Sequence, residues 1–175
     1  YVKVHQDFYP RFSEEILMNC LRDFEMQPDV NFKHLSMGQK KKIYMSFAVA
    51  SCCQLLLMDE PTNGLDIPSK ALFRKVIAGN LPSDSSLIIS THQVHDVEQL
   101  LDHVFVLNNS EMIINASVEE IAKEYEFTYR NANEMDENVL YAEPSLQGNA
   151  VIARRKADSP ETTINLELLF NAATL

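Results

Sequence analysis

Two adjacent carboxylates, Asp59 and Glu60, directly follow the apolar run Leu55–Met58. A short apolar run without polar alternation predicts a strand that is covered on both faces, as in a parallel sheet. At the end of such a strand Asp59 could hold a magnesium ion, and Glu60 could orient or deprotonate a water molecule. Taken alone, an Asp-Glu pair at this place is also consistent with a solvated turn.

A histidine follows the next apolar run along the chain, Leu87–Ser90, in the order Thr91-His92. In open α/β sheets ligands gather at the carboxyl ends of the strands. There His92 could hydrogen-bond a terminal phosphate and the attacking water. A capping or surface histidine is the alternative. Together these residue types favour the hydrolysis of a phosphate.

A third candidate group is Ser36-Met37-Gly38-Gln39, which precedes a predicted helix. A serine hydroxyl, a flexible glycine and the exposed N–H groups of a helix N-terminus can bind an anion. A serine N-cap followed by glycine, with no ligand, has the same appearance. The lysines at 40–42 are consistent with either a phosphate-attracting patch or a solvated helix face.

The apolar periodicity predicts alternating strands and helices around these residues. Helices are predicted over 13–26, 38–50, 68–77, 94–101 and 117–125, and strands over 55–58, 87–90, 104–107 and 112–114. Strands that alternate with helices favour an α/β layered domain with a parallel sheet. The polar stretch 128–137 is a candidate boundary, after which come short strand-like pieces and a terminal apolar segment, 164–170.

Composition limits the class of protein. The 175 residues are 46% hydrophobic and carry a net charge of −10, which argues against broad nucleic-acid binding. No run reaches the ~18–20 apolar residues of a membrane span. Cys20, Cys52 and Cys53 fit neither a disulfide framework nor a zinc spacing, so we expect reduced thiols. The chain begins with Tyr1, which suggests a piece of a longer protein.

In their order and spacing, LSMGQ, LLLMDEPTNGLD and STHQ resemble motifs of the ATP-binding subunits of ABC transporters. The resemblance covers about residues 30–125. It implies a P-loop NTPase-like α/β domain with ATP and Mg²⁺ as cofactors. The stretch 7–12 also looks like the start of the helical subdomain in bacterial exporters of the antibiotic-resistance and efflux kind.

The resemblance also implies roles for individual residues. The signature motif, which contacts the terminal phosphate of ATP on the opposing subunit, corresponds to Ser36, Gly38 and Gln39. The carboxylate that supports magnesium corresponds to Asp59, the carboxylate that polarises water to Glu60, the loop at the dimer seam to residues 63–66 with Asp66, and the switch histidine to His92. Met37 departs from the family, where a glycine is usual.

One family motif is missing from the sequence. A phosphate-binding loop needs G-x-x-x-x-G-K-[ST], and none of the four glycines is followed by lysine. We therefore expect an incomplete parallel sheet, a helical subdomain segment over 1–50, the C-terminal part of an ATPase core over 51–127 and a small extension over 128–175. Such a chain alone should bind ATP poorly and be inactive, and its open sheet edge should favour self-association.

The resemblance further implies partners and location. These are a second nucleotide-binding subunit and transmembrane permease subunits, with no nucleic acid, at the inner face of the cell membrane. Three alternatives stay open. The chain could be the C-terminal ATPase lobe of a coiled-coil chromosome-maintenance or DNA-repair protein, a soluble translation-associated relative, or a non-enzymatic partner that contributes only its signature face.

Overall fold

The computed structural model describes residues 2–156 and 158–174, which form two compact units. The first unit ends at Leu100 and the second begins at Leu101. The first three residues of the polar stretch 128–137 belong to a strand. The three predicted domains stay a prediction.

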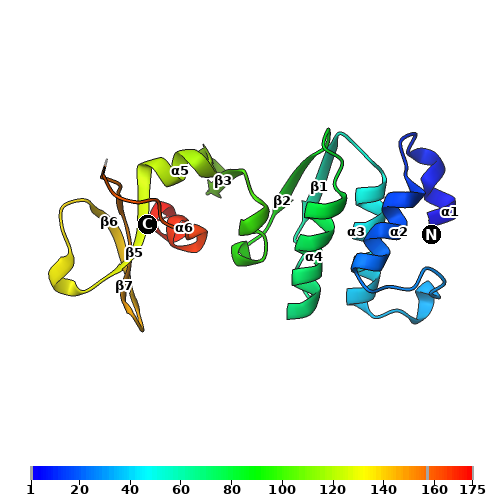
Figure 1. Cartoon of the computed structure of the whole chain (residues 1–175), viewed down its shortest axis with the longest axis horizontal. Coiled ribbons are helices and arrows are strands. Elements are labelled where there is room, and N and C mark those ends of the chain that lie inside the picture. Colours follow the sequence, from blue (N-terminus) through cyan, green and yellow to red (C-terminus); the bar gives the residue numbers. More distant parts are fainter. Residues whose placement is uncertain (1, 157, 175) are drawn as a thin grey trace. The chain divides into compact units, whose positions relative to one another are not determined.

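The first unit consists mainly of helices, together with a two-stranded sheet (Figure 1). Its α-helices and strands are α1 (Val2–His5), α2 (Glu14–Asp23), α3 (Met37–Ala50), β1 (Leu55–Asp59), α4 (Ile67–Asn80) and β2 (Ser86–Ser90). Its 3₁₀ turns are η1 (Gln6–Phe8), η2 (Phe32–His34), η3 (Val94–Asp96) and η4 (Glu98–Leu100). The strands β1 and β2 pair in parallel, which confirms the predicted parallel arrangement.

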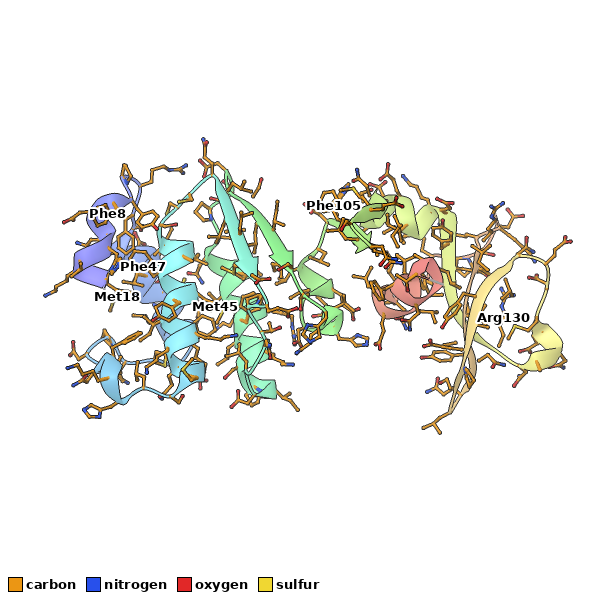
Figure 2. All side chains as sticks on the ribbon, turned by 180° about the vertical axis from the view of Figure 1, so that it is seen from behind. Phe8, Met18, Met45, Phe47, Phe105 and Arg130 are labelled. Atoms are coloured by element: carbon orange, nitrogen blue, oxygen red, sulfur yellow. The ribbon has the colours of Figure 1, made fainter. Side chains whose placement is uncertain are left out.

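The core of this unit lies between α2, α3 and α4. Phe24 and Phe73 are completely buried there, and α4 contacts both α2 and α3. On the other side of α3, Phe47 points toward the N-terminal segment (Figure 2), where its ring centroid lies 5.4 Å from that of Tyr9 and 5.1 Å from that of Phe12. Aromatic rings at these distances pack favourably, so the N-terminal segment is fixed to α3.

The strand β1 is not covered on both faces, as the apolar run predicted. Leu55 and Leu57 are 53% and 66% exposed, whereas Met58 is buried. Successive side chains of a strand point to opposite faces, and within the described residues the helices cover one of them. The exposed face continues onto β2 at Ile88, which is 47% exposed.

Two predicted helices differ from the structure. The helix predicted over 13–26 ends at Asp23, because Glu25 has a positive φ of 58° and the N–H of Met26 bonds to the carbonyl of Leu21. This is a left-handed helix terminus of the Schellman kind. The helix predicted over 94–101 is replaced by η3 and η4. There the guanidinium of Arg74, in α4, donates a hydrogen bond to the carbonyl of Asp96.

The second unit contains a hairpin, the short helices α5 and α6 and a three-stranded antiparallel sheet. Its elements are β3 (His103–Asn108), β4 (Glu111–Ser117), α5 (Val118–Glu124), β5 (Tyr125–Arg130), η5 (Ala132–Glu134), β6 (Val139–Ser145), β7 (Gly148–Arg154) and α6 (Leu166–Thr174). The strand order of the sheet is β5-β7-β6. The strands β3 and β4 pair as an antiparallel hairpin, and Ser117 and Glu120 form a capping box at the start of α5.

The terminal apolar segment folds back onto its own unit. It forms α6, which buries Leu166, Leu168 and Leu169 and contacts β6 and β7. The central strand β7 carries the fully buried Val151 and Ala153. The terminal apolar segment therefore packs on the sheet of its own unit.

A cluster of charged side chains joins β5 to the segments that follow it. Arg130 of β5 (Figure 2) bonds to the buried Glu126 and lies 3.3 Å from Asp136, which also accepts a hydrogen bond from Lys156 at 3.0 Å. The hydrogen bond from Lys156, followed by those from Asn138, holds the pKa of the Asp136 carboxyl well below its ordinary value. Asp136 therefore stabilises this unit only while it is ionised.

The stability of the second unit should thus depend on pH through Asp136. A depressed folded pKa contributes stability that is present above the unfolded value of about 3.9 and is lost as the pH falls below it. We expect Asp136→Asn to lower the thermal unfolding midpoint at pH 7, with the difference from the wild type shrinking below about pH 4. The exposed Asp102 gives the control, Asp102→Asn. A difference between Asp136→Asn and the wild type that stays constant with pH would contradict the assignment.

Candidate active site

The parallel register of β1 and β2 brings the predicted strand ends together. Asp59 pairs with Ser90 in the register, and the N–H of Glu60 donates to the carbonyl of Ser90 at 2.9 Å. The residues after each strand, Glu60 on one side and Thr91 and His92 on the other, therefore meet at one edge of the sheet. This is the edge at which open α/β sheets bind ligands.

The carboxylate of Glu60 is bound by the loop after β2 on both of its oxygens. Oε2 accepts from Thr91 Oγ1 at 3.0 Å, and Oε1 accepts from the backbone N–H of His92 at 3.0 Å and lies 2.6 Å from His92 Nδ1. The hydrogen bond from the His92 ring, followed by that from Thr91, holds the pKa of the Glu60 carboxyl below its usual value. The group is thus an ionised carboxylate at neutral pH and can accept a proton.

Glu60 also has an unusual backbone conformation. Its φ is +43°, in the left-handed region that residues other than glycine rarely adopt. Residues in this conformation are costly and persist only where the surrounding structure fixes them. Here the N–H is held by β2 and the side chain by Thr91 and His92.

Asp59 lies beside this pair at the exposed end of β1 and accepts a hydrogen bond from the hydroxyl of Ser90. In the part of the chain that the structure describes, no three His, Cys, Asp or Glu side chains come together as a metal site. Magnesium commonly keeps several waters and binds through one or two carboxylates and the phosphates of a nucleotide. One exposed carboxylate therefore fits the protein's share of a magnesium site.

The group at Ser36 forms the N-terminus of α3. The hydroxyl of Ser36 accepts from the N–H of Gln39 at 3.2 Å, and the side chain of Gln39 accepts from the N–H of Ser36 at 3.0 Å. This capping box orients the motif while Ser36 and Gln39 stay exposed, together with Met37. Within residues 2–156 and 158–174, Ser36, Gly38 and Gln39 make no hydrogen bond to Asp59, Glu60 or His92.

Asp66 caps a helix in the structure. It is the N-cap of α4, with Oδ1 accepting from the N–H of Ser69 at 2.9 Å. Hydrogen bonds from Ser69, the side chain first and then the backbone, lower the pKa of its carboxyl. Two consecutive turns connect Glu60 to Asp66. The first is closed by the N–H of Asn63 and the second by the N–H of Leu65, and the second contains Gly64 at φ +76°. The role of Asp66 toward a nucleotide stays a prediction.

Sequence reasoning missed three residues that support this site: Ser90, Thr91 and Lys41. Ser90 and Thr91 bind the two carboxylates from β2 and the loop after it. Their place in the sequence, directly before His92, could have indicated this once the strands were paired in register. Lys41 of α3 donates to the loop after β1, and no feature of the sequence singles it out from its two neighbouring lysines.

The described part of the chain holds no helix with the length and apolar character needed to cross a membrane.

A family model described as "AAA domain, putative AbiEii toxin, Type IV TA system" matches residues 21–95. This stretch contains both the group at Ser36 and the edge with Glu60 and His92.

Two of the curated proteins that this chain resembles are ATP-binding proteins of transporters. The ABC transporter ATP-binding protein YtrB of Bacillus subtilis is 23% identical over 71% of this chain and 43% of its own length. The energy-coupling factor transporter ATP-binding protein EcfA of Methanococcus maripaludis is 30% identical over 73% of this chain and 45% of its own length. The chain thus spans less than half the length of these relatives.

The fold agrees with the sequence comparison. The solved structure of an ATP-binding subunit of an ABC transporter superposes with a TM-score of 0.55 at 21% identity, over 69% of this chain and 54% of the other. The predicted fold class, an α/β P-loop NTPase-like domain, is confirmed by the likeness to solved structures of ABC transporter ATP-binding proteins. Over part of its length, the chain is a distant homologue of the ATP-binding proteins of ABC transporters, and it shares their fold.

Proposed function

We propose that this chain supplies the water-activating and signature groups of an ATP-hydrolysing subunit that energises an ABC transporter. The observation that carries the proposal is the placement of Glu60. Its ionised carboxylate lies against Thr91 and His92 at the carboxyl ends of two parallel strands, next to Asp59. The family likeness supports ATP as the nucleotide.

In the proposed reaction Glu60 acts as the general base. It orients a water molecule and accepts its proton as the oxygen attacks the terminal phosphate. His92 holds the carboxylate through Nδ1, so its Nε2, on the other side of the ring, is the atom that can face a phosphate oxygen. Asp59 would hold Mg²⁺, which when bound neutralises phosphate charge.

The signature group would act on a nucleotide held by another subunit. Ser36 and the exposed N–H groups at the start of α3 can donate to a terminal phosphate, because both lie at the positive end of a 14-residue helix. The glycine at 38 allows the phosphate to approach the backbone closely. The 175 residues contain no G-x-x-x-x-G-K-[ST] segment. In this proposal the phosphate-binding loop is therefore supplied by residues outside these 175.

This arrangement implies the remaining parts of the proposal. A second nucleotide-binding subunit faces Ser36, and the two subunits close on the nucleotide. Permease subunits couple this closure to movement of the transported substrate. The assembly lies at the inner face of the cell membrane. Transport of the efflux kind follows from the resemblance at residues 7–12. The exposed apolar face with Leu55, Leu57 and Ile88 favours association of the isolated chain.

Titration with MgATP, followed through the backbone amide signals of the chain by NMR, tests the proposal. We expect weak binding, with a Kd above about 1 mM, because only part of the site is present. The shifted signals should lie at residues 36–39, 59–66 and 90–92. MgAMP, which lacks the β- and γ-phosphates, is the control and should leave these signals unchanged. Shifts confined to residues 101–174, or binding in the micromolar range, would place the nucleotide site elsewhere.

A further inference from the structure

The three consecutive lysines after Gln39 have different contacts. The ammonium of Lys40 lies 5.7 Å from the centre of the Phe32 ring, and that of Lys42 lies 6.0 Å from the centre of the Phe24 ring. Lys41 instead reaches the loop after β1, where its Nζ donates to the carbonyl of Asn63 at 2.5 Å and to that of Glu60 at 3.2 Å. Lys41 alone of the three therefore binds the loop that carries the candidate base.

The two carbonyls bound by Lys41 are the first and the last of one turn. The N–H of Asn63 donates to the carbonyl of Glu60 at 3.3 Å, which closes the turn over Pro61 and Thr62. Thr62 is completely buried and anchors the turn to the core. An ammonium that binds both ends of a turn holds it closed, since opening it would leave carbonyls without their charged donor.

The same turn fixes the direction of the Glu60 side chain. With a left-handed φ of +43°, Glu60 places its carboxylate against Thr91 and His92 across the sheet edge. On one side the conformation is fixed by the N–H of Glu60, which bonds to Ser90. On the other side it is fixed at the carbonyl, by Lys41. If the carbonyl were released, the peptide could rotate and withdraw the carboxylate.

We propose that Lys41 is a positioning residue for Glu60, which holds the turn 60–63 in the conformation that places the carboxylate against Thr91 and His92. The importance of this position rests on the proposed function, in which Glu60 is the base. The contact itself does not, and its test needs no nucleotide. A failure of the positioning role is therefore distinguishable from a failure of the proposed ATP hydrolysis.

The test compares Lys41→Met with Lys40→Met, which removes the neighbouring charge from the same helix. In each variant of the chain, NMR follows two signals of Glu60. The Cα and carbonyl carbon shifts report its backbone conformation, and the pH titration of its side-chain carboxyl carbon reports its hydrogen bonds. Lys41→Arg, which keeps the charge and the donors, should restore both signals to those of the wild type.

For Lys41→Met we expect the backbone signals of Glu60 to leave the left-handed range. The titration midpoint should rise toward the ordinary carboxyl value of about 4.3, because the bonds from His92 and Thr91 that lower it are lost. Lys40→Met should leave both signals unchanged. A raised midpoint with an unchanged backbone would show only the loss of a positive charge and would overturn the proposal, as would equal effects of the two variants. Should Lys41→Met not fold, Lys41→Gln, which is shorter and neutral, is judged by the same two signals.

Discussion

In the proposed reaction, Glu60→Gln should lower the rate of ATP hydrolysis by about 10²–10⁴-fold. The substituted amide has nearly the same shape, and its oxygen can still accept a hydrogen bond from Thr91. It cannot accept a proton from water, however, and it carries no charge to pair with His92. Binding of the nucleotide should be preserved, because Glu60 is proposed to act on the water and not on the phosphate.

The measurement is phosphate release at saturating MgATP, by an assembly in which this chain is completed by the phosphate-binding loop that the proposed function requires. Glu119→Gln provides a matched control. Glu119 is an exposed residue of the second unit whose ion pair with Lys123 lies on the surface of α5. Equal rates for wild type and Glu60→Gln would remove Glu60 from the reaction and favour a non-enzymatic partner that contributes only its signature face.

The low pKa of Glu60 adds a dependence on pH to this result. The His92 ring is the main cause of the lowering, so the carboxylate stays ionised at and above neutral pH. Activity that depends on Glu60 as a base should fall only when the pH drops through its folded pKa, below the ordinary carboxyl range. An acid limb near pH 6.5 would instead report a histidine.

Features that depend on neighbouring residues could be predicted from the sequence. The caps at Ser13, Ser36 and Ser117 involve side chains within three positions of each other, and all three occur in the structure. The same holds for the strands whose ends carry Asp59 and His92, because their apolar runs are short and sharply bounded. Local chemistry of this kind is encoded within a few residues.

Features that depend on distant residues could not. The bond from Ser90 to Asp59 joins residues 31 positions apart, and that from Lys41 to Glu60 joins residues 19 positions apart. Both follow from strand register and helix placement, which a single sequence does not specify. The sheet β5-β7-β6 was missed for the same reason, since its pairing crosses a polar stretch that resembles a linker. The exposed face of β1 shows that an apolar run predicts burial only where something covers it.

The largest effect on stability is expected from the core of the first unit. Phe73 is fully buried on α4, which packs against α2 and α3. Phe73→Ala removes a ring from this position and leaves a cavity, so the free energy of unfolding of the first unit should fall by about 3–5 kcal/mol. Because the stability of a domain is of similar size, this variant could leave the unit largely unfolded at 37 °C.

Urea unfolding followed by circular dichroism measures the loss, with Phe8→Ala as the control. Phe8 is 76% exposed in the same unit, so the identical substitution there should change the free energy by no more than about 0.5 kcal/mol. Because a chain of two compact units need not unfold in a single transition, amide exchange must assign the transition that the substitution shifts. If the loss fell on residues 101–174, or if Phe8→Ala matched Phe73→Ala, α4 would not be the centre of this core. A loss confined to residues 2–100 would instead tie the positions of β1 and β2, and with them Glu60 and His92, to the packing of α4.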